Sequence, residues 1–237
     1  MGPVGPVGPA AVVLVAAGAG TRLGATVPKA FFLLAGQSLL TRALVTVAEC
    51  PDVSSVVIVA PASHLAAAAA AAFDARVPAR VVVVVAPGGT DRGDSVAAGL
   101  AALPDEPSVV LVHDVARALA PASLFTAVIE AVRQGHQAVV PGLAVVDTIK
   151  QVDATGLVVA TPERSALRAI QTPQGFTREL LVRAHESAAG HPVTDDAALV
   201  ERMGIGVHVI DGDRRALKIT TPEDLVLAEL LLERNRT

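Results

Sequence analysis

The sequence is poor in aromatic residues and in cysteine. Trp and Tyr are absent and Phe occurs five times in 237 residues, so an aromatic platform on which single-stranded bases stack is not expected. The one cysteine, Cys50, excludes an internal disulfide and a cysteine-rich zinc site. The net charge of −4 argues against a general binder of nucleic-acid phosphates.

Long apolar runs are also missing, although hydrophobic residues make up 52% of the chain and charged residues only 18%. The mean hydropathy of +0.54 comes from Ala and from short Val runs such as Val81–Val85. No run approaches the roughly 18 to 20 apolar residues that a membrane-spanning helix needs. We therefore expect a soluble cytoplasmic protein that binds neither nucleic acid nor membrane.

Gly and Pro dominate the first nine residues. Three collagen-like triplets are too few to sustain a triple helix, and no charged segment precedes them as in a secretory signal. We expect residues 1–9 to form a flexible tail and residues 10–237 to form one domain.

From residue 11 onward, short Val-rich runs alternate with longer segments of helical spacing. Strands are expected at Ala11–Ala16, Ser55–Ala60, Arg80–Val85, Val109–Val112, Ala138–Pro141 and Gly206–Ile210. Helices are expected at Ser38–Glu49, Ala62–Asp74, Asp94–Ala102, Pro121–Arg133, Thr177–Ala189 and Asp195–Met203, with a last helix capped by Thr221. Because the strands are apolar throughout, the pattern predicts an α/β fold whose mostly parallel sheet is covered by helices on both faces.

One segment interrupts this alternation. Two extended runs, Val145–Val152 and Leu157–Ala160, flank Asp153-Ala154-Thr155-Gly156, which is typical of a hairpin turn. The hairpin is expected to form an arm over residues 143–165 or so. This hairpin either contacts another subunit or is an ordinary hairpin at the edge of the sheet.

A glycine-rich loop follows the first strand. Gly18, Gly20 and Gly24 allow backbone N–H groups to approach a phosphate, and Arg22 and Lys29 add positive charge. The GxGxxxG spacing and the lack of an acid after the second strand do not fit a dinucleotide-binding fold. The sequence therefore predicts a cradle for a polyphosphate, with two cations beside it.

A second loop, Gly88–Ser95, follows the third strand. Its small residues would permit a flat group to approach closely, and Arg92 and Ser95 could donate to the edge of a base. Taken alone, the loop is better interpreted as the start of a helix capped by Asp94 or Ser95.

A third polar segment, His113–Arg117, follows the fourth strand. Ligands of open α/β sheets bind beyond the carboxyl ends of the strands, so Asp114 is placed to hold Mg²⁺ or a sugar hydroxyl and Arg117 to hold an anion. His113 is more typical of a structural histidine, because no second histidine lies at ligand spacing.

Lysine is rare in this chain, which has sixteen Arg and three Lys. An ammonium is a compact point charge and not a planar fork, so a site that needs one resists replacement by Arg. All three lysines, Lys29, Lys150 and Lys218, lie in segments that draw attention for other reasons, which favours a functional role.

Seven motifs occur in order along the chain. They are Ala-Ala-Gly-x-Gly-x-Arg-x-Gly followed by Pro-Lys, Gly-Gly-x-x-Arg-x-x-Ser-Val, His-Asp-x-Ala-Arg, Asp-Thr-x-Lys, Thr-Pro-Gln-x-Phe, Thr-Asp-Asp and Lys-Ile-Thr-x-Pro-Glu-Asp-Leu. Over residues 10–234 the ordered set resembles the 2-C-methyl-D-erythritol 4-phosphate cytidylyltransferase family of the non-mevalonate isoprenoid pathway.

The resemblance implies a Rossmann-like nucleotidyltransferase that uses CTP, a sugar-alcohol phosphate and Mg²⁺, as a homodimer joined through the arm. It implies catalytic roles for Arg22, Lys29, Arg164 and Lys218. It implies contacts to the nucleotide from Ala16, Ala17, Gly18, Gly20, Gly89, Thr90, Arg92, Ser95, Asp114 and Ala116. It implies contacts to the acceptor from Asp114, Arg117, Thr148, Arg164, Thr194 and Lys218, with Asp114 also holding the metal.

The chain departs from the family pattern at a few positions, which include Thr90, Ala30 and Val115, but none removes a charged group assigned to the chemistry. Three alternatives remain open beside the leading interpretation. The first is a cytidylyltransferase for ribitol phosphate or another alditol phosphate. The others are a dinucleotide-dependent oxidoreductase, which the loop spacing opposes, and a nucleotide-binding module without activity.

Overall fold

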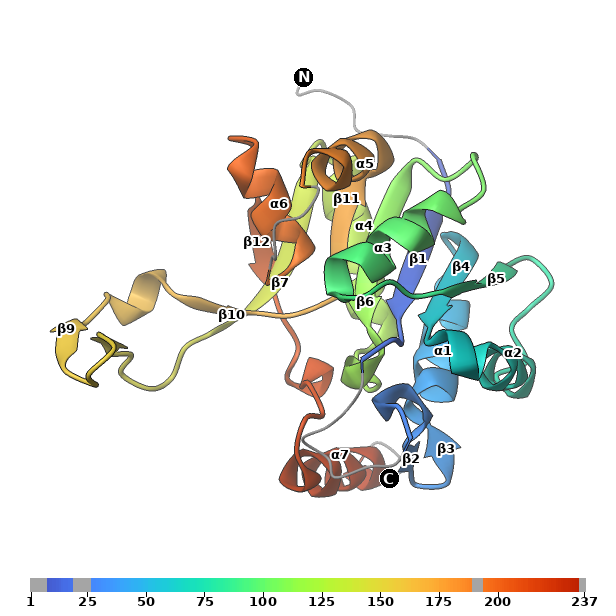
Figure 1. The fold of residues 1–237 in the computed structure, drawn as a ribbon, viewed down its shortest axis with the longest axis horizontal. Coiled ribbons are helices and arrows are strands. Elements are labelled where there is room, and N and C mark those ends of the chain that lie inside the picture. Colours follow the sequence, from blue (N-terminus) through green and yellow to red (C-terminus); the bar gives the residue numbers. More distant parts are fainter. Residues whose placement is uncertain (1–7, 19–26, 189–193, 235–237) are drawn as a thin grey trace.

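The computed structural model describes residues 8–18, 27–188 and 194–234, and its centre is one mixed β-sheet (Figure 1). The strands of this sheet are β1 (Ala10–Val15), β4 (Val53–Ala60), β5 (Val82–Pro87), β6 (Val109–Asp114), β7 (Ala138–Ala144), β10 (Arg168–Ile170), β11 (Gln174–Thr177) and β12 (His208–Asp211). They lie in the order β5-β4-β1-β6-β11-β7, and β7 also pairs with β10 and β12. The pairs β5–β4, β4–β1, β1–β6 and β7–β12 are parallel, whereas β11 runs antiparallel to both β6 and β7.

Both faces of the sheet are buried, which accounts for strands without polar alternation. On β1, Val12 and Leu14 belong to one apolar cluster, while Ala11 and Val13 belong to the cluster on the opposite face. Successive side chains of a strand point to opposite faces, so a strand with apolar neighbours on both sides must be apolar at every position.

Helices cover the two faces. The first cluster contains buried residues of α1 (Leu39–Glu49), α2 (Leu65–Asp74), α4 (Ala122–Arg133) and α7 (Pro222–Arg234). The second contains buried residues of α3 (Arg92–Ala101), α5 (Arg178–Ser187) and α6 (Asp196–Arg202). The expected α/β architecture, with a largely parallel sheet between helical layers, is therefore confirmed. Within the described residues, no helix is both long and apolar enough to cross a membrane.

Two small hairpins stand apart from the central sheet. One, β2 (Leu33–Leu34) with β3 (Gln37–Ser38), leads into α1, and the other, β8 (Gln151–Val152) with β9 (Val158–Ala160), forms an arm that projects from the body of the protein (Figure 1). The arm turns where Asp153 Oδ1 accepts hydrogen bonds from the Thr155 and Leu157 N–H groups, at 2.9 and 3.1 Å. The hairpin was expected, but its first strand is much shorter than Val145–Val152.

Several expected boundaries were wrong. The third strand begins at Val82 and not at Arg80, and the last begins at His208 and not at Gly206. The α3 cap is Asp91, whose Oδ1 accepts from the Asp94 N–H at 2.8 Å, and not Asp94 or Ser95. Strands β10 and β11 were not expected at all. Residues 1–7 of the expected tail lie outside the described residues.

Candidate active site

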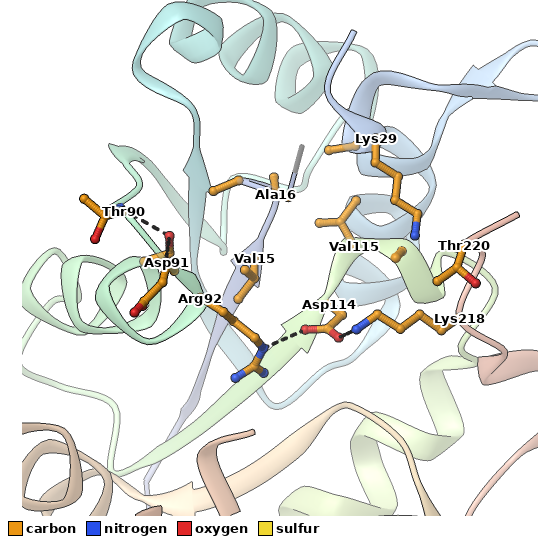
Figure 2. Close-up of a pocket in the computed structure, with 16 residues that line it drawn as sticks. Val15, Ala16, Lys29, Thr90, Asp91, Arg92, Asp114, Val115, Lys218 and Thr220 are labelled. Atoms are coloured by element: carbon orange, nitrogen blue, oxygen red, sulfur yellow. Dashed lines mark hydrogen bonds and ion pairs between the residues drawn. The ribbon is translucent and has the colours of Figure 1, made fainter. Parts of the chain in front are cut away.

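A pocket of about 440 Å³ lies at the carboxyl ends of β1 and β6 (Figure 2). It is lined by residues from five separate segments of the chain: Val15, Ala16, Ala17, Gly18, Lys29, Ala30, Gly89, Thr90, Asp91, Arg92, Ser95, Asp114, Val115, Ala116, Lys218 and Thr220. The parallel strands end at one edge of the sheet, so loops that are distant in sequence meet there. Eleven of the residues expected from the sequence line this pocket.

The loop that leads into α3 is fixed by its own polar groups. The Ser95 hydroxyl donates to the Asp91 carbonyl at 2.7 Å and accepts from the Gly89 N–H at 3.2 Å. A Cβ on Gly89 would come within 2.2 Å of Asp94 Cβ, so this position admits no side chain. Ser95 was expected to donate to a base edge. In the structure its one proton is used inside the loop, so its first role here is to shape the wall of the pocket.

Asp114 pairs with two cations of the pocket, Arg92 and Lys218. Its Oδ2 lies 2.7 Å from Lys218 Nζ, and its Oδ1 lies 3.3 Å from Arg92 Nε (Figure 2). Burial alone would raise the pKa of Asp114, but the two cations outweigh burial and lower it below its usual range. Asp114 is therefore charged at neutral pH, and it orients Arg92 and Lys218.

A buried hydroxyl fixes the backbone of Asp114. Thr172 Oγ1 accepts a hydrogen bond from the Asp114 N–H at 3.1 Å and is also hydrogen-bonded to His113 Nδ1 at 3.1 Å. Burial lowers the pKa of His113 to about 4, so the imidazole is neutral at pH 7. Its ring packs on Phe125 with the centroids 4.8 Å apart. His113 and Thr172 thus support the site from behind.

Arg117 lies outside the pocket lining and binds backbone. Its Nη1 donates to the Ala216 carbonyl at 2.7 Å, and its Nη2 donates to the Ile170 carbonyl at 3.3 Å. Burial lowers its pKa. In this structure Arg117 joins the segment before Lys218 to the end of β10, and it supports the wall of the site.

The other expected acceptor residues are not brought to the pocket. Thr194 is exposed just before α6, and Thr148 and Arg164 lie on either side of the β8–β9 hairpin, within residues 143–165 of the arm. Arg164 Nη1 donates to the Val146 carbonyl at 2.7 Å, which joins the two sides of the arm at its base. Gly20 and Arg22 lie outside the described residues.

Sequence reasoning gave no role to three residues that build the site. Asp91 caps α3, Thr172 holds Asp114, and Asp196 lies 2.8 Å from Arg92 through its Oδ2. The motifs around Thr172 and Asp196 were visible in the sequence as Gln-Thr-Pro-Gln and Thr-Asp-Asp. Nothing in the sequence indicated which residues they contact.

The donors of the pocket fit a cation that is held mainly by its substrate. Among the described residues, no group of three or more His, Cys, Asp or Glu could hold a metal ion by itself. Asp114 supplies a single buried carboxylate, ionised at neutral pH. Mg²⁺ is often bound through one or two carboxylates together with substrate phosphates and water, and Asp114 can serve in that way.

Comparisons with known proteins identify the family. The family model described as IspD, 2-C-methyl-D-erythritol 4-phosphate cytidylyltransferase, matches residues 10–234. The chain is 49% identical to the enzyme of that name from Streptomyces avermitilis, covering 95% of this chain and 92% of the relative. It is 50% identical to the one from Rhodococcus jostii, covering 95% and 96%.

Comparison with solved structures indicates the same family. The 4-diphosphocytidyl-2C-methyl-D-erythritol synthase of Anaerococcus prevotii superposes with a TM-score of 0.83 at 29% identity, covering 96% of this chain and 97% of that one. The 2-C-methyl-D-erythritol 4-phosphate cytidylyltransferase of Thermus thermophilus gives a TM-score of 0.73 at 36% identity, covering 93% and 98%. The chain therefore belongs to the IspD family, the 2-C-methyl-D-erythritol 4-phosphate cytidylyltransferases.

Proposed function

We propose that the pocket beyond β1 and β6 transfers CMP from CTP to 2-C-methyl-D-erythritol 4-phosphate and releases pyrophosphate. The observation that carries this proposal is that Lys29, Arg92 and Lys218 line one pocket, where Arg92 and Lys218 pair with the buried carboxylate of Asp114, in a chain of the IspD family. The reaction brings two anions together, and fixed cations reduce the repulsion between them.

The chemistry needs no general base. An oxygen of the acceptor phosphate attacks the α-phosphorus of CTP, the bond from that phosphorus to the β-phosphate oxygen breaks, and pyrophosphate leaves. A phosphate monoester is largely dianionic at neutral pH, so its oxygen is already deprotonated. This agrees with the state of His113, which lies behind the pocket and is buried, neutral and hydrogen-bonded to Thr172.

The phosphates of CTP are bound by the glycine-rich loop and its cations. Backbone N–H groups near Gly18 approach the phosphates, and Lys29 neutralises charge on the α-phosphate and the leaving pyrophosphate, together with Arg22. The loop around Gly89 receives the cytosine. Asp114 would hold Mg²⁺, which as a Lewis acid would stabilise charge on the phosphates.

The acceptor is bound by Lys218 and Thr194 of one subunit and by Thr148 and Arg164 of a partner. The last two lie on the arm, which also exposes apolar side chains: Val146 is 71% exposed and Leu157 is 67% exposed. Exposed apolar surface of this kind is typical of a protein interface. We therefore include in the proposal a homodimer in which each arm completes the other subunit's site.

The proposal also covers domain organisation and location. Residues 10–237 act as one domain, and the free thiol of Cys50 suits the reducing cytoplasm.

Turnover with two acceptors tests the proposal. With CTP and Mg²⁺, we expect pyrophosphate release with 2-C-methyl-D-erythritol 4-phosphate at a kcat/KM about 100-fold or more above that with ribitol 5-phosphate. Lys29→Ala should lower kcat by about 10² to 10³, as expected for loss of a group that stabilises transition-state charge, while CTP still binds measurably.

The matched control is Arg183→Ala, which removes an exposed cation of α5 that pairs only loosely with Glu179, at 3.9 Å. Arg183→Ala should keep wild-type turnover. A preference for ribitol 5-phosphate, or full turnover by Lys29→Ala, would contradict the proposal.

A further inference from the structure

The charged network of the pocket continues into the protein beyond the residues that line it. Asp196, the first residue of α6, is fully buried at 0% exposure. Its Oδ2 lies 2.8 Å from Arg92 Nη1, and its Oδ1 lies 3.0 Å from His185 Nε2 on α5. Asp196 does not line the pocket, and the pocket residue that it contacts is Arg92.

Oδ1 of Asp196 is hydrogen-bonded to His185 and Oδ2 forms an ion pair with Arg92, so both partners restrict the orientation of its carboxylate. A carboxylate only accepts hydrogen bonds, so His185 Nε2 must carry the shared proton. A buried carboxylate without partners is strongly unfavourable, and His185 and Arg92 together offset that cost. His185 therefore holds the far side of Asp196 while Arg92 holds the near side.

Arg92 has a contact on each side of its guanidinium. Nε lies 3.3 Å from Asp114 and Nη1 lies 2.8 Å from Asp196. Burial would lower the pKa of Arg92, but Asp196 and Asp114 raise it above its ordinary value. The third nitrogen, Nη2, is buried and has no hydrogen-bond partner among the described residues. A long side chain is thus held in one orientation by two carboxylates.

The start of α6 is itself held in place by Gln174 of β11, which is buried. Gln174 Nε2 donates to Asp195 Oδ2 at 2.8 Å, and its Oε1 accepts from the Ala197 N–H at 3.2 Å. These two contacts lie on either side of Asp196 in the sequence. The backbone that carries Asp196 is therefore fixed from the sheet, and the carboxylate is presented to Arg92 at a set position.

We propose that Asp196 is a positioning residue for CMP transfer, which sets the orientation of Arg92 against Asp114 and the nucleotide. The inference rests on the proposed function, because Arg92 acts on the nucleotide only if the pocket binds CTP. Asp196 also lies two residues after Thr194, so it joins the proposed acceptor segment to the nucleotide side of the pocket.

A double-mutant cycle tests the proposal. Asp196→Asn, which keeps the size of the side chain and removes its charge, should lower kcat/KM for CTP by about 10- to 100-fold, the range for residues that orient a site group. Arg92→Ala should lower it at least as far. Both changes disrupt the same interaction between Asp196 and Arg92. The kcat/KM of the double variant should therefore be no more than about threefold below that of Arg92→Ala alone.

Losses that multiply in the double variant would overturn the proposal, since a merely structural Asp196 would act independently of Arg92. Unchanged kinetics of Asp196→Asn would overturn it as well. Glu201→Gln, which neutralises an exposed carboxylate of the same helix, is the matched control and should keep wild-type kinetics.

A second pair of variants keeps the test sharp if Asp196→Asn does not fold. His185→Gln retains an N–H donor for Asp196, whereas His185→Leu has a similar size and no donor. We expect the Leu variant to lose several-fold in kcat/KM and the Gln variant to stay within about twofold of wild type. Equal kinetics of the two variants would overturn the proposal. Absence of CMP transfer by the wild-type protein would instead overturn the proposed function.

Discussion

At the scale of single residues, Asp114 pairs with two cations of different shape, an ammonium and a guanidinium. Lys218 Nζ lies 2.7 Å from one oxygen of Asp114, and the Arg92 guanidinium lies 3.3 Å from the other. The chain has sixteen Arg and only three Lys, so the lysine at position 218 differs from the arginine that this chain uses for most of its positive charges. An ammonium leaves its remaining donors free to turn toward a ligand, whereas a guanidinium has a fixed fork.

Lys218→Arg should therefore impair the reaction although it preserves the charge. We expect kcat/KM for the acceptor to fall about tenfold or more, because a planar fork next to Arg92 cannot reproduce the contact that a compact ammonium makes. Arg214→Lys, the reverse exchange at an exposed site nearby, is the control and should be neutral. Equal acceptor kinetics of Lys218→Arg and wild type would show that charge alone matters at this position.

The sequence predicted the cations that line the pocket better than the residues that hold those cations in place. Lys29, Arg92 and Lys218 were expected because ligands bind beyond strand ends and because lysine is rare in this chain. Asp196 and Thr172 were missed, because their roles depend on contacts between β6, β11, α3 and α6 that are distant along the chain. A buried Asp at a helix start reads in sequence as an ordinary capping residue.

At the scale of elements, the start of α7 fixes the segment that carries Lys218. Asp224 Oδ2 accepts from the Thr220 N–H, the Thr220 hydroxyl and the Thr221 N–H, at 2.7, 2.7 and 2.8 Å. Thr221 Oγ1 in turn accepts from the Asp224 N–H at 3.3 Å. The cap expected from Thr221 and Pro222 is confirmed, and it lies next to a residue that lines the pocket, Thr220.

Asp224→Ala should destabilise the protein in a pH-dependent way. At pH 7 we expect the free energy of unfolding to fall by about 1 to 2 kcal/mol, the usual effect of losing side-chain hydrogen bonds that cap a helix start. Burial would raise the pKa of Asp224, but its hydrogen bonds to Thr220 and Thr221 outweigh this effect and lower it. The stabilisation is therefore present above the ordinary Asp pKa of about 4 and is lost as pH falls through the lower folded value.

Urea unfolding of wild type and Asp224→Ala at pH 7, 5 and 3 measures this difference. It should be constant between pH 7 and 5 and smaller at pH 3. Glu229→Ala, on an exposed position of the same helix, should show no such trend. A difference that grows on acidification would contradict the assigned hydrogen bonds.

Elements that pack by apolar pattern were predictable, and those that pack by tertiary contact were not. The Val-rich strands β1, β4, β5 and β6 and the amphipathic helices follow from periodicity. Strand β11 contains Gln174 and Gly175 and is only four residues long, so its sequence carries no strand signal. A Cβ at Gly175 would come within 2.3 Å of Val128 on α4, which shows that close packing and not propensity determines this strand.

At the scale of the whole molecule, the described pocket and the arm are separate, and the arm carries two of the expected acceptor residues. The hairpin turn was predictable from Asp153 to Gly156, but a single sequence does not indicate what the arm touches. Its exposed apolar side chains, Val146, Ile149 and Leu157 among them, favour burial against another copy of the chain. In a dimer with twofold symmetry, the arm of each subunit would contact the other subunit in the same way.

Mixing two inactive variants tests whether the arm acts on the partner's site. Lys29→Ala disables the pocket and Arg164→Ala disables the arm, so each homodimer should have little activity. In a heterodimer of the two, one site combines both defects, and the other combines an intact pocket with an intact arm. Random pairing of equal amounts makes half of the dimers heterodimers, so we expect recovery of about one quarter of wild-type turnover.

The matched control mixes Lys29→Ala with Lys218→Ala, both of which alter the pocket. Every site of that heterodimer carries a defective pocket, so no activity should return. Subunits with different affinity tags, refolded together and purified on both tags, would isolate the heterodimer and raise its expected activity to about half of wild type, because one of its two sites is intact. If the isolated Lys29→Ala and Arg164→Ala heterodimer stays inactive, the arm serves its own subunit or none.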